Sequence, residues 1–388
     1  MQGMERTDDL KGLYENAHRF VSAGEYGLAI EVYSTLFQEL TAEDAKAARG
    51  GPETIELLSA TANELVELLR WERRYDQAID AQERLGRLFP ASASGMRLSL
   101  ANLKLEAGES AYALGELNEI ARESPRNIWG WLALASAHMW LADYEDAEKL
   151  LKRAAELPEV EEADLAEAHR QLFALYSVQG RVDDAMAAWE RACALDPSLV
   201  EMRPEVIRML VHYRHWNRAG ELVDQETCEV RKLFYSGLIY IHEGLGGAAY
   251  GAWDQLMDTY DPDALTEGRD EYAEGALHSI RPQHALKALG PLIGVRDATR
   301  HRMLLAGLAW AQLRVINRAE GCLDVALRMA DLERPRRTRP NGEYRILDAA
   351  SRILYATVII DQDVRARLDH YFIPNKRQEA GHTPGGSD

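Results

Sequence analysis

The histidines in the second half of the chain are the residues whose types come closest to a metal site. His212 and His215 are three residues apart and therefore share one face of a helix. Three histidines can bind zinc where they converge, and further along the chain follow His242, His278, His284 and His301. No local spacing fixes a third ligand, so we expect surface or inter-helix histidines and no metal, with zinc binding left as the minor alternative.

Other motifs that carry chemistry are weak or absent. The glycine-rich segment Gly244–Gly251 has no following Lys-Ser/Thr and no preceding strand, so we interpret it as a turn between helices, not a phosphate loop. No GxSxG motif occurs, and Cys193, Cys228 and Cys322 sit among apolar or small neighbours. The sequence therefore predicts a protein that is not an enzyme and needs no cofactor.

The charge is unevenly distributed along the chain. The formal net charge is −18, made up of −24 over residues 1–280 and +6 over residues 281–388. Nucleic acid as a main partner is disfavoured, because its phosphates require a net cationic face. A local basic patch remains, formed by Arg334, Arg336, Arg337 and Arg339.

This arginine cluster lies in a segment, residues 333–343, whose prolines and Asn-Gly exclude a helix. It is compatible with a carboxylate-rich partner, with phosphates, or with a merely solvated loop. Because the rest of the chain is acidic, self-association through ends of opposite charge is a further possibility.

Composition also suggests where the protein works. Met1–Gly12 mixes charges without an apolar stretch, so we expect no secretory signal. The longest apolar stretch, Trp131–Ala142, is interrupted by Ser136 and His138, and we expect no membrane span. Three widely spaced cysteines suit a reducing, cytoplasmic setting. The tail, residues 373–388, has the Gly, Pro and polar content of disorder.

An internal repeat decides the fold. A series of alanines recurs at intervals of 30 to 38 residues, and several prolines follow at similar spacing and should each close a helix. The clearest unit, Ala166–Pro197, contains two helix patterns separated by a turn at Gly180. One hairpin cannot cover both apolar faces, so such units must stack on their neighbours. The recurring positions are Ala78, Ala113, Ala147, Ala185, Ala219, Ala249, Ala285 and Ala319.

These units resemble the tetratricopeptide repeat family. Ile128–Pro158 carries residues at the family's signature places, namely Trp131, Leu134, Ala135, His138, Tyr144, Ala147 and Ala154. The resemblance implies an all-α, right-handed superhelical solenoid of about nine helix-turn-helix repeats over residues 10–332. We expect an insertion at residues 40–53 and capping helices over residues 344–372, which would cover the end of the last repeat.

The resemblance also implies which residues meet a partner. In this family the first helix of each unit lines a concave groove that grips an extended peptide or a partner's helix. Trp129, Trp140 and Phe234 could instead pack between repeats. The residues placed in the groove are Asn102, Trp129, Leu132, Trp140, Arg170, Arg208, His212, Arg231 and Phe234.

An acidic stripe on one later helix is a possible electrostatic contact, or simply a solvated face. It comprises Glu267, Asp270, Glu271 and Glu274. The carboxylate clamp of the family's chaperone adaptors is not supported, because only Lys11 and Asn102 would suit it. The function we expect is a scaffold or adaptor subunit that binds a protein or peptide. The alternatives are a sensor of a small ligand or peptide, and an accessory subunit that contacts nucleic acid through its basic C-terminal part.

Overall fold

The computed structural model describes residues 2–22, 25–42, 52–89, 93–290, 299–332 and 354–372. Most of the expected insertion at residues 40–53, the arginine cluster (Arg334, Arg336, Arg337 and Arg339), the first part of the expected cap and the tail lie outside these ranges. All regular elements within them are helices, and the prediction of an all-α helical-repeat solenoid is confirmed. In the same ranges, no helix has the length and apolar character that crossing a membrane requires.

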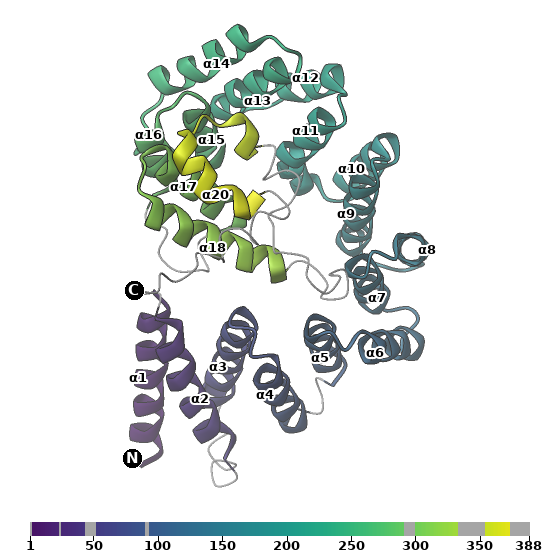
Figure 1. The fold of residues 1–388 in the computed structure, drawn as a ribbon. Coiled ribbons are helices and arrows are strands. Elements are labelled where there is room, and N and C mark those ends of the chain that lie inside the picture. Colours follow the sequence, from purple (N-terminus) through teal and green to yellow (C-terminus); the bar gives the residue numbers. More distant parts are fainter. Residues whose placement is uncertain are drawn as a thin grey trace, which may run out of the picture. The chain divides into compact units, whose positions relative to one another are not determined.

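The helices divide into two compact units, with the boundary inside α7 after Ala137. Figure 1 labels the helices of both units. The first unit contains α1 (Gln2–Ser22), α2 (Tyr26–Thr41), α3 (Pro52–Trp71), α4 (Tyr75–Leu88), α5 (Ala93–Ala107), α6 (Ser110–Glu123) and most of α7 (Ile128–Trp140).

The second unit begins with the end of α7. It contains α8 (Tyr144–Ala155), α9 (Glu162–Gln179), α10 (Val182–Leu195), the 3₁₀ helix η4 (Pro197–Met202), α11 (Arg203–His212), α12 (Trp216–Asp224), α13 (Glu229–His242), α14 (Gly246–Thr259), α15 (Arg269–His278), α16 (Pro282–Leu289), α17 (Arg300–Gln312), α18 (Ile316–Leu332) and α20 (Gln362–Phe372).

The recurring alanine marks the same place in every pair of helices. From α1/α2 to α17/α18 the described chain forms nine such pairs, and the alanine is the fourth residue of each second helix. Each of these alanines, now including Ala29, is 0% exposed. In the last pair, a Cβ on Gly307 of α17 would lie only 3.3 Å from the carbonyl oxygen of Ala319. A methyl side chain at this position therefore lets the paired backbones come close together.

The turn inside each pair also has one geometry. The residue five places before the alanine has a left-handed φ of 59° to 96° in seven turns and 56° at Ile280. The next residue donates its N–H to the carbonyl five residues earlier, at 2.8–2.9 Å, as Arg181 does to Tyr176. This pattern is the Schellman C-cap, which satisfies carbonyls left free at a helix end. In the described turns, the residue with the left-handed φ is Arg73, Gly108, Ala142, Gly180, Arg214, Gly244, Ile280 or Arg314.

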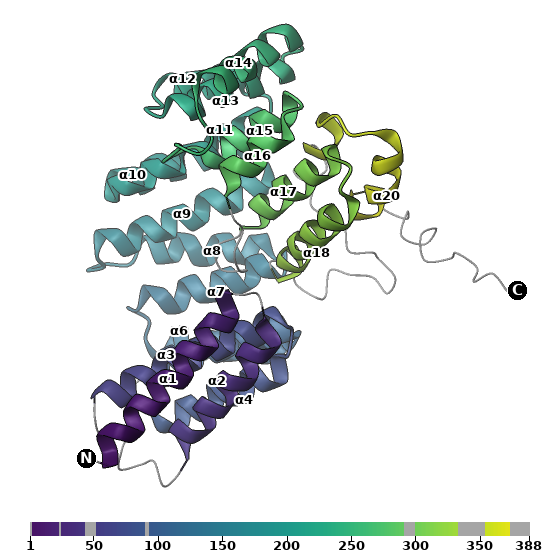
Figure 2. The ribbon, with the colours of Figure 1, turned by 90° about the vertical axis from the view of Figure 1, so that its left-hand side faces the viewer.

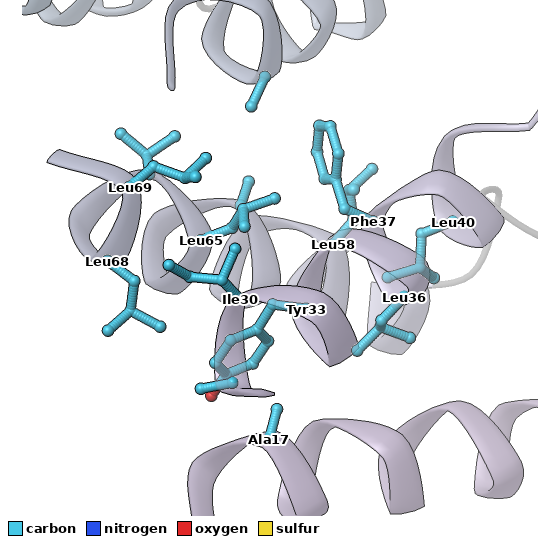
Figure 3. Packing of buried hydrophobic residues seen from close by; sticks show 14 of the residues in the cluster. Ala17, Ile30, Tyr33, Leu36, Phe37, Leu40, Leu58, Leu65, Leu68 and Leu69 are labelled. Carbon is cyan, nitrogen blue, oxygen red and sulfur yellow. The ribbon is translucent and has the colours of Figure 1, made fainter. Parts of the chain in front are cut away.

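The core of the first unit shows how the apolar faces pack. Figure 3 shows Ile30, Tyr33 and Leu36 of α2 between Ala17 of α1 and the leucines of α3. Tyr33 is fully buried, and its ring meets that of Tyr14 edge-on at 5.5 Å between centroids. The buried positions recur every three or four residues, so each helix presents one apolar stripe to its neighbours.

The second unit contains one helix that is buried almost all round. From Tyr272 to His278 every residue of α15 is buried, and α15 contacts α13, α14, α16 and α17. Its small residues allow this packing, because a Cβ on Gly275 would lie 3.2 Å from Leu256 and 3.6 Å from Phe234. A charge on a buried helix needs a partner, so Glu274 of α15 must be paired with a basic group.

The last described segment, residues 354–372, folds back onto the second unit. It consists of a helical turn at residues 354–357 followed by α20, and we call it the C-terminal hairpin. Figures 1 and 2 both place α20 alongside α18. Tyr371 Oη donates to Asp324 at 2.8 Å, and Gln312 Nε2 donates to the carbonyls of Leu277 and Ile359. The hairpin thus packs against the last helical pair, and Gln312 of α17 links it to α15.

We expect Ala185→Leu to lower the free energy of unfolding by about 1–3 kcal/mol, because a larger side chain at a fully buried site forces the paired helices apart. Ala187→Leu is the matched control, since Ala187 is exposed on the same helix and its replacement should change stability by less than about 0.5 kcal/mol. Urea denaturation of both variants measures the difference. Equal effects would show that the recurring alanine does not set the helix spacing.

We expect Ile280→Gly to raise the free energy of unfolding by about 0.5–1 kcal/mol. A side chain in the left-handed region costs about 1–2 kcal/mol, which exceeds the entropic cost of glycine, about 0.5–1 kcal/mol. Ile280 is 54% exposed, so little packing is lost. Gly244→Ala is the converse variant, because its new Cβ meets nothing within 4 Å and only the backbone is strained. Thermal denaturation should show shifts of opposite sign, and shifts of the same sign would refute the argument.

Candidate functional site

The centre of the candidate site is an ion pair between α11 and α15. Arg208 Nη2 lies 2.9 Å from Glu274 Oε2, and Arg208 Nη1 lies 3.4 Å from Oε1, so both oxygens are engaged. The Glu274 side chain is only 5% exposed and that of Arg208 is 33% exposed. His301 of α17 places its Nε2 3.3 Å from Glu274 Oε2. The first helices α11, α15 and α17 of three pairs thereby bring together one buried anion and two basic groups.

The charges of this cluster stabilise one another. Burial alone would raise the pKa of Glu274, but the Arg208 guanidinium and His301 hold that pKa below its ordinary value. Burial alone would lower the pKa of Arg208, but Glu274 raises it above its ordinary value. Glu274 is therefore a carboxylate and Arg208 a cation at neutral pH.

Aromatic rings of α13 support the arginine. Arg208 Cζ lies 5.3 Å from the ring centroid of Phe234 and 5.4 Å from that of Tyr235, which is within the range of cation–π contacts. Tyr235 Oη donates to Glu271 Oε1 at 3.0 Å, and burial raises the pKa of this tyrosine. Both rings are 0% exposed, so they pack against the guanidinium within the second unit.

An apolar pocket of about 360 Å³ lies on one side of the ion pair. The first helices α9, α11, α13 and α15 form its walls, and the C-terminal hairpin adds Leu354 and Thr357. Below, we call it the apolar pocket. Its apolar lining includes Val178, Met209, Val211, Leu238 and Ile241.

A second, polar pocket of about 460 Å³ adjoins the same ion pair. It is lined from α11, α13, α15 and α17, with Glu205, Asp270, Glu271, Arg300 and His301 among its side chains. Arg208, Glu274 and Leu354 belong to the walls of both pockets. An apolar and a charged recess therefore lie next to each other along consecutive first helices.

The C-terminal hairpin that contributes Leu354 is held together by its own contacts. Tyr355 Oη lies 3.0 Å from Asp369 Oδ1 and 2.9 Å from the carbonyl oxygen of Arg365, and its single proton is shared between these two acceptors. The Tyr355 ring stacks on Phe372 with 3.9 Å between centroids. The Arg365 guanidinium donates to the carbonyls of Tyr355 and Val358. Leu354 is thus presented to the pockets by a locally ordered segment.

The structure distributes the expected groove residues over several environments. In the first unit Asn102 is exposed, Trp129 is 49% exposed and Leu132 is buried. In the second unit Trp140 is half-buried. Phe234 is buried, which agrees with the alternative that this side chain packs between repeats.

The charged groove residues are mostly engaged within the second unit. Arg170 pairs with Glu167 on its own helix, and Arg231 lies 3.9 Å from Glu226 and 4.0 Å from Glu271. Of the expected groove residues, Arg208 and His212 line the apolar pocket.

Three of the four acidic residues have partners within the chain, which argues against the alternative that they form one solvated face. Asp270 pairs with Arg302 at 2.7 Å, and Glu271 and Glu274 take part in the contacts described above. Glu267 alone of the four is exposed.

Four of the histidines line the two pockets. His212, His242 and His278 line the apolar pocket and His301 lines the polar one. In the described residues, the cluster whose potential ligand atoms lie within 4.8 Å of one another is instead His138, Asp143 and Asp146. Lys149 is 2.8 Å from Asp146 and partly neutralises that cluster.

Paired helices with a buried alanine in each second helix define an all-α helical-hairpin repeat fold. No protein-family model and no curated protein matches the sequence. The chain is similar in structure to a tetratricopeptide repeat protein from Parabacteroides merdae, with 15% identity over 73% of this chain and 100% of that chain and a TM-score of 0.37.

Two further solved structures are similar to parts of the chain. BtubC from P. vanneervenii shares 20% identity over 62% of this chain and 96% of that chain, with a TM-score of 0.37. A human IFIT1 dimer with m7Gppp-AAAA shares 16% identity over 79% of this chain and 68% of that chain, with a TM-score of 0.43. At these identities the likeness concerns the fold alone.

We expect Arg208→Met to destabilise the second unit more than Glu274→Gln does. The first leaves a buried carboxylate with His301 as its remaining basic contact in the cluster, and breaking a buried pair in this way costs about 3–5 kcal/mol. The second leaves an arginine that is one-third exposed and can turn to water, so its cost should be about 1 kcal/mol. Urea denaturation at neutral pH measures both, and equal costs would contradict the assigned burial.

The pH dependence of the free energy of unfolding of Glu274→Gln and of the native chain tests whether Glu274 is ionised. Because the pKa of Glu274 is lower in the folded chain than its ordinary value of 4.5, its contribution to stability is complete above that value and declines as the pH falls below it. The stability gap between the native chain and Glu274→Gln should therefore narrow on acidification. A gap independent of pH would show that Glu274 is not ionised in the folded state.

Proposed function

We propose that this chain is a non-catalytic binding scaffold whose second unit receives a segment of a partner protein. The observation that supports this most directly is the pair of adjoining pockets, of about 360 and 460 Å³, on consecutive first helices. In a stacked repeat the first helices face one side, so neighbouring recesses follow the run of the array. A bound segment could use both recesses at once.

The two pockets would make different contributions to binding. Burial of an apolar side chain in the first recess supplies affinity, at about 25 cal/mol per Å² of apolar surface. The charged recess, with Glu205, Asp270 and Arg300 in its lining, would fix the register of the bound segment and reject mismatched partners. This division, an apolar anchor beside polar contacts, is the usual anatomy of a protein interface.

Accessible residues at the edge of the apolar pocket are the contacts we propose first. Val178 is 62% exposed and His212 is exposed, and both line this pocket. In the first unit, Asn102 and Trp129 remain proposed partner contacts because they too are exposed. The half-buried free thiols of Cys193, Cys228 and Cys322 support a reducing compartment such as the cytoplasm.

We expect the double variant Val178→Glu/His212→Glu to lose at least tenfold in affinity for peptides selected on the native chain. Two carboxylates at an apolar opening would have to be desolvated on binding, and both side chains are exposed in the free protein, so folding should be unaffected. The experiment is a display selection of random peptides on the full chain, followed by fluorescence anisotropy of the enriched sequences.

Leu245→Glu is the matched control for this prediction. Leu245 is 52% exposed at the start of α14, a second helix, and lines neither pocket. Selected peptides should bind it as they bind the native chain. Peptides that lose affinity for the control, or keep full affinity for the double variant, would place binding elsewhere on the molecule.

A further inference from the structure

Several polar side chains around the apolar pocket have partners within the chain. Arg208 and Glu274 bind each other, Ser177 Oγ donates to the carbonyl of Phe173, and Tyr213 Oη donates to the carbonyl of Ser177 at 2.8 Å. His278 differs, because its Nε2 is buried and has no hydrogen-bond partner among the described residues. The residue is 5% exposed and lines the pocket.

The imidazole of His278 is held in one orientation. It stacks on Trp253 with 4.3 Å between ring centroids and 12° between the ring planes. Trp253 is itself fully buried, and its Nε1 donates to the carbonyl of Phe234 at 3.2 Å. The ring of His278 therefore cannot easily turn to satisfy Nε2, and a bound group that did so would recover the lost hydrogen bond.

The charges in the pocket favour an uncharged ligand. Burial lowers the pKa of His278, so its ring is neutral at physiological pH and can hydrogen-bond without attracting a net charge. An anion would meet the carboxylate of Glu274 and a cation the guanidinium of Arg208, and these two groups already neutralise each other. Neither sign of charge finds an uncompensated counter-ion here.

We infer that the apolar pocket binds an aromatic or similarly apolar group that carries one neutral hydrogen-bonding oxygen, a hydroxyl or carbonyl, which pairs with Nε2 of His278. The pocket's 360 Å³ lies within the usual size of small-molecule sites, about 300–1,000 Å³. This inference rests on the proposed function in using the same pocket. The group can belong to a side chain of the partner segment, such as a tyrosine, or to a free small molecule.

Three naphthalene derivatives test this chemistry on the full chain. We expect β-naphthol to bind at least tenfold more tightly than naphthalene, which lacks the oxygen, and than β-naphthoate, which carries a charge. Ligand-observed NMR titration gives the three affinities. Equal binding of β-naphthol and naphthalene, tighter binding of β-naphthoate, or no binding of any of them would overturn the inference.

His278→Phe keeps a ring to stack on Trp253 but removes the nitrogen. It should reduce the affinity for β-naphthol to that for naphthalene and leave naphthalene binding unchanged. His215→Phe, at the start of α12 and outside the pocket lining, should behave like the native chain. A preference for β-naphthol that survives His278→Phe would overturn the assignment of Nε2.

Leu238→Trp provides a test that does not depend on the folding of the histidine variant. Leu238 is half-buried in the pocket wall, so a larger side chain should fill the space and abolish binding of β-naphthol. Retained binding would move the site away from this pocket.

Competition separates the two sources of ligand and keeps the inference distinct from the proposed function. Selected peptides that displace β-naphthol would assign the group to a partner's side chain. If no peptide is selected but β-naphthol binds as expected, the scaffold proposal fails while the pocket chemistry stands, and the ligand is a free molecule.

Discussion

The close approach of two helices at a buried alanine is the constraint on which the rest of this structure depends. Each second helix has a methyl group at its fourth position, and the turn before it repeats one hydrogen-bonded geometry. Because these two features fix the geometry of each helix pair locally, pairs with quite different surfaces can follow one another along the chain. The pockets of the second unit arise from that regularity, since it brings the first helices of successive pairs side by side.

At the centre of the second unit, α15 is covered on all sides, and the helices around it must supply partners for its buried charge. A buried carboxylate is tolerated on α15 because Arg208 of α11 pairs with it and His301 of α17 lies beside it. The same cluster divides the inner surface into an apolar and a charged recess. An ion pair that stabilises the array therefore also shapes the surface that we propose to be functional.

The repeat could be predicted from the sequence because the close approach of the paired helices requires a small residue at one position. That position recurs once in every helix pair. The sequence did not reveal the pairing of Arg208 with Glu274, which are 66 residues apart and meet only through stacked helices. Phe234 was placed in the groove by its helix position, but α15 covers α13 and buries it. Leu354 carried no signal, because its role depends on the chain returning to earlier helices.

The left-handed turn has a consequence for how such a chain diverges. Arginine, alanine and isoleucine occupy that turn as well as glycine, and the hydrogen bonds around it are the same in each case. The conformation is thus enforced by the flanking helices and not by the residue itself. Substitutions can accumulate at the turn until no glycine marks it, while the hairpin keeps its shape. Divergence of this kind erases a repeat from the sequence long before it alters the fold.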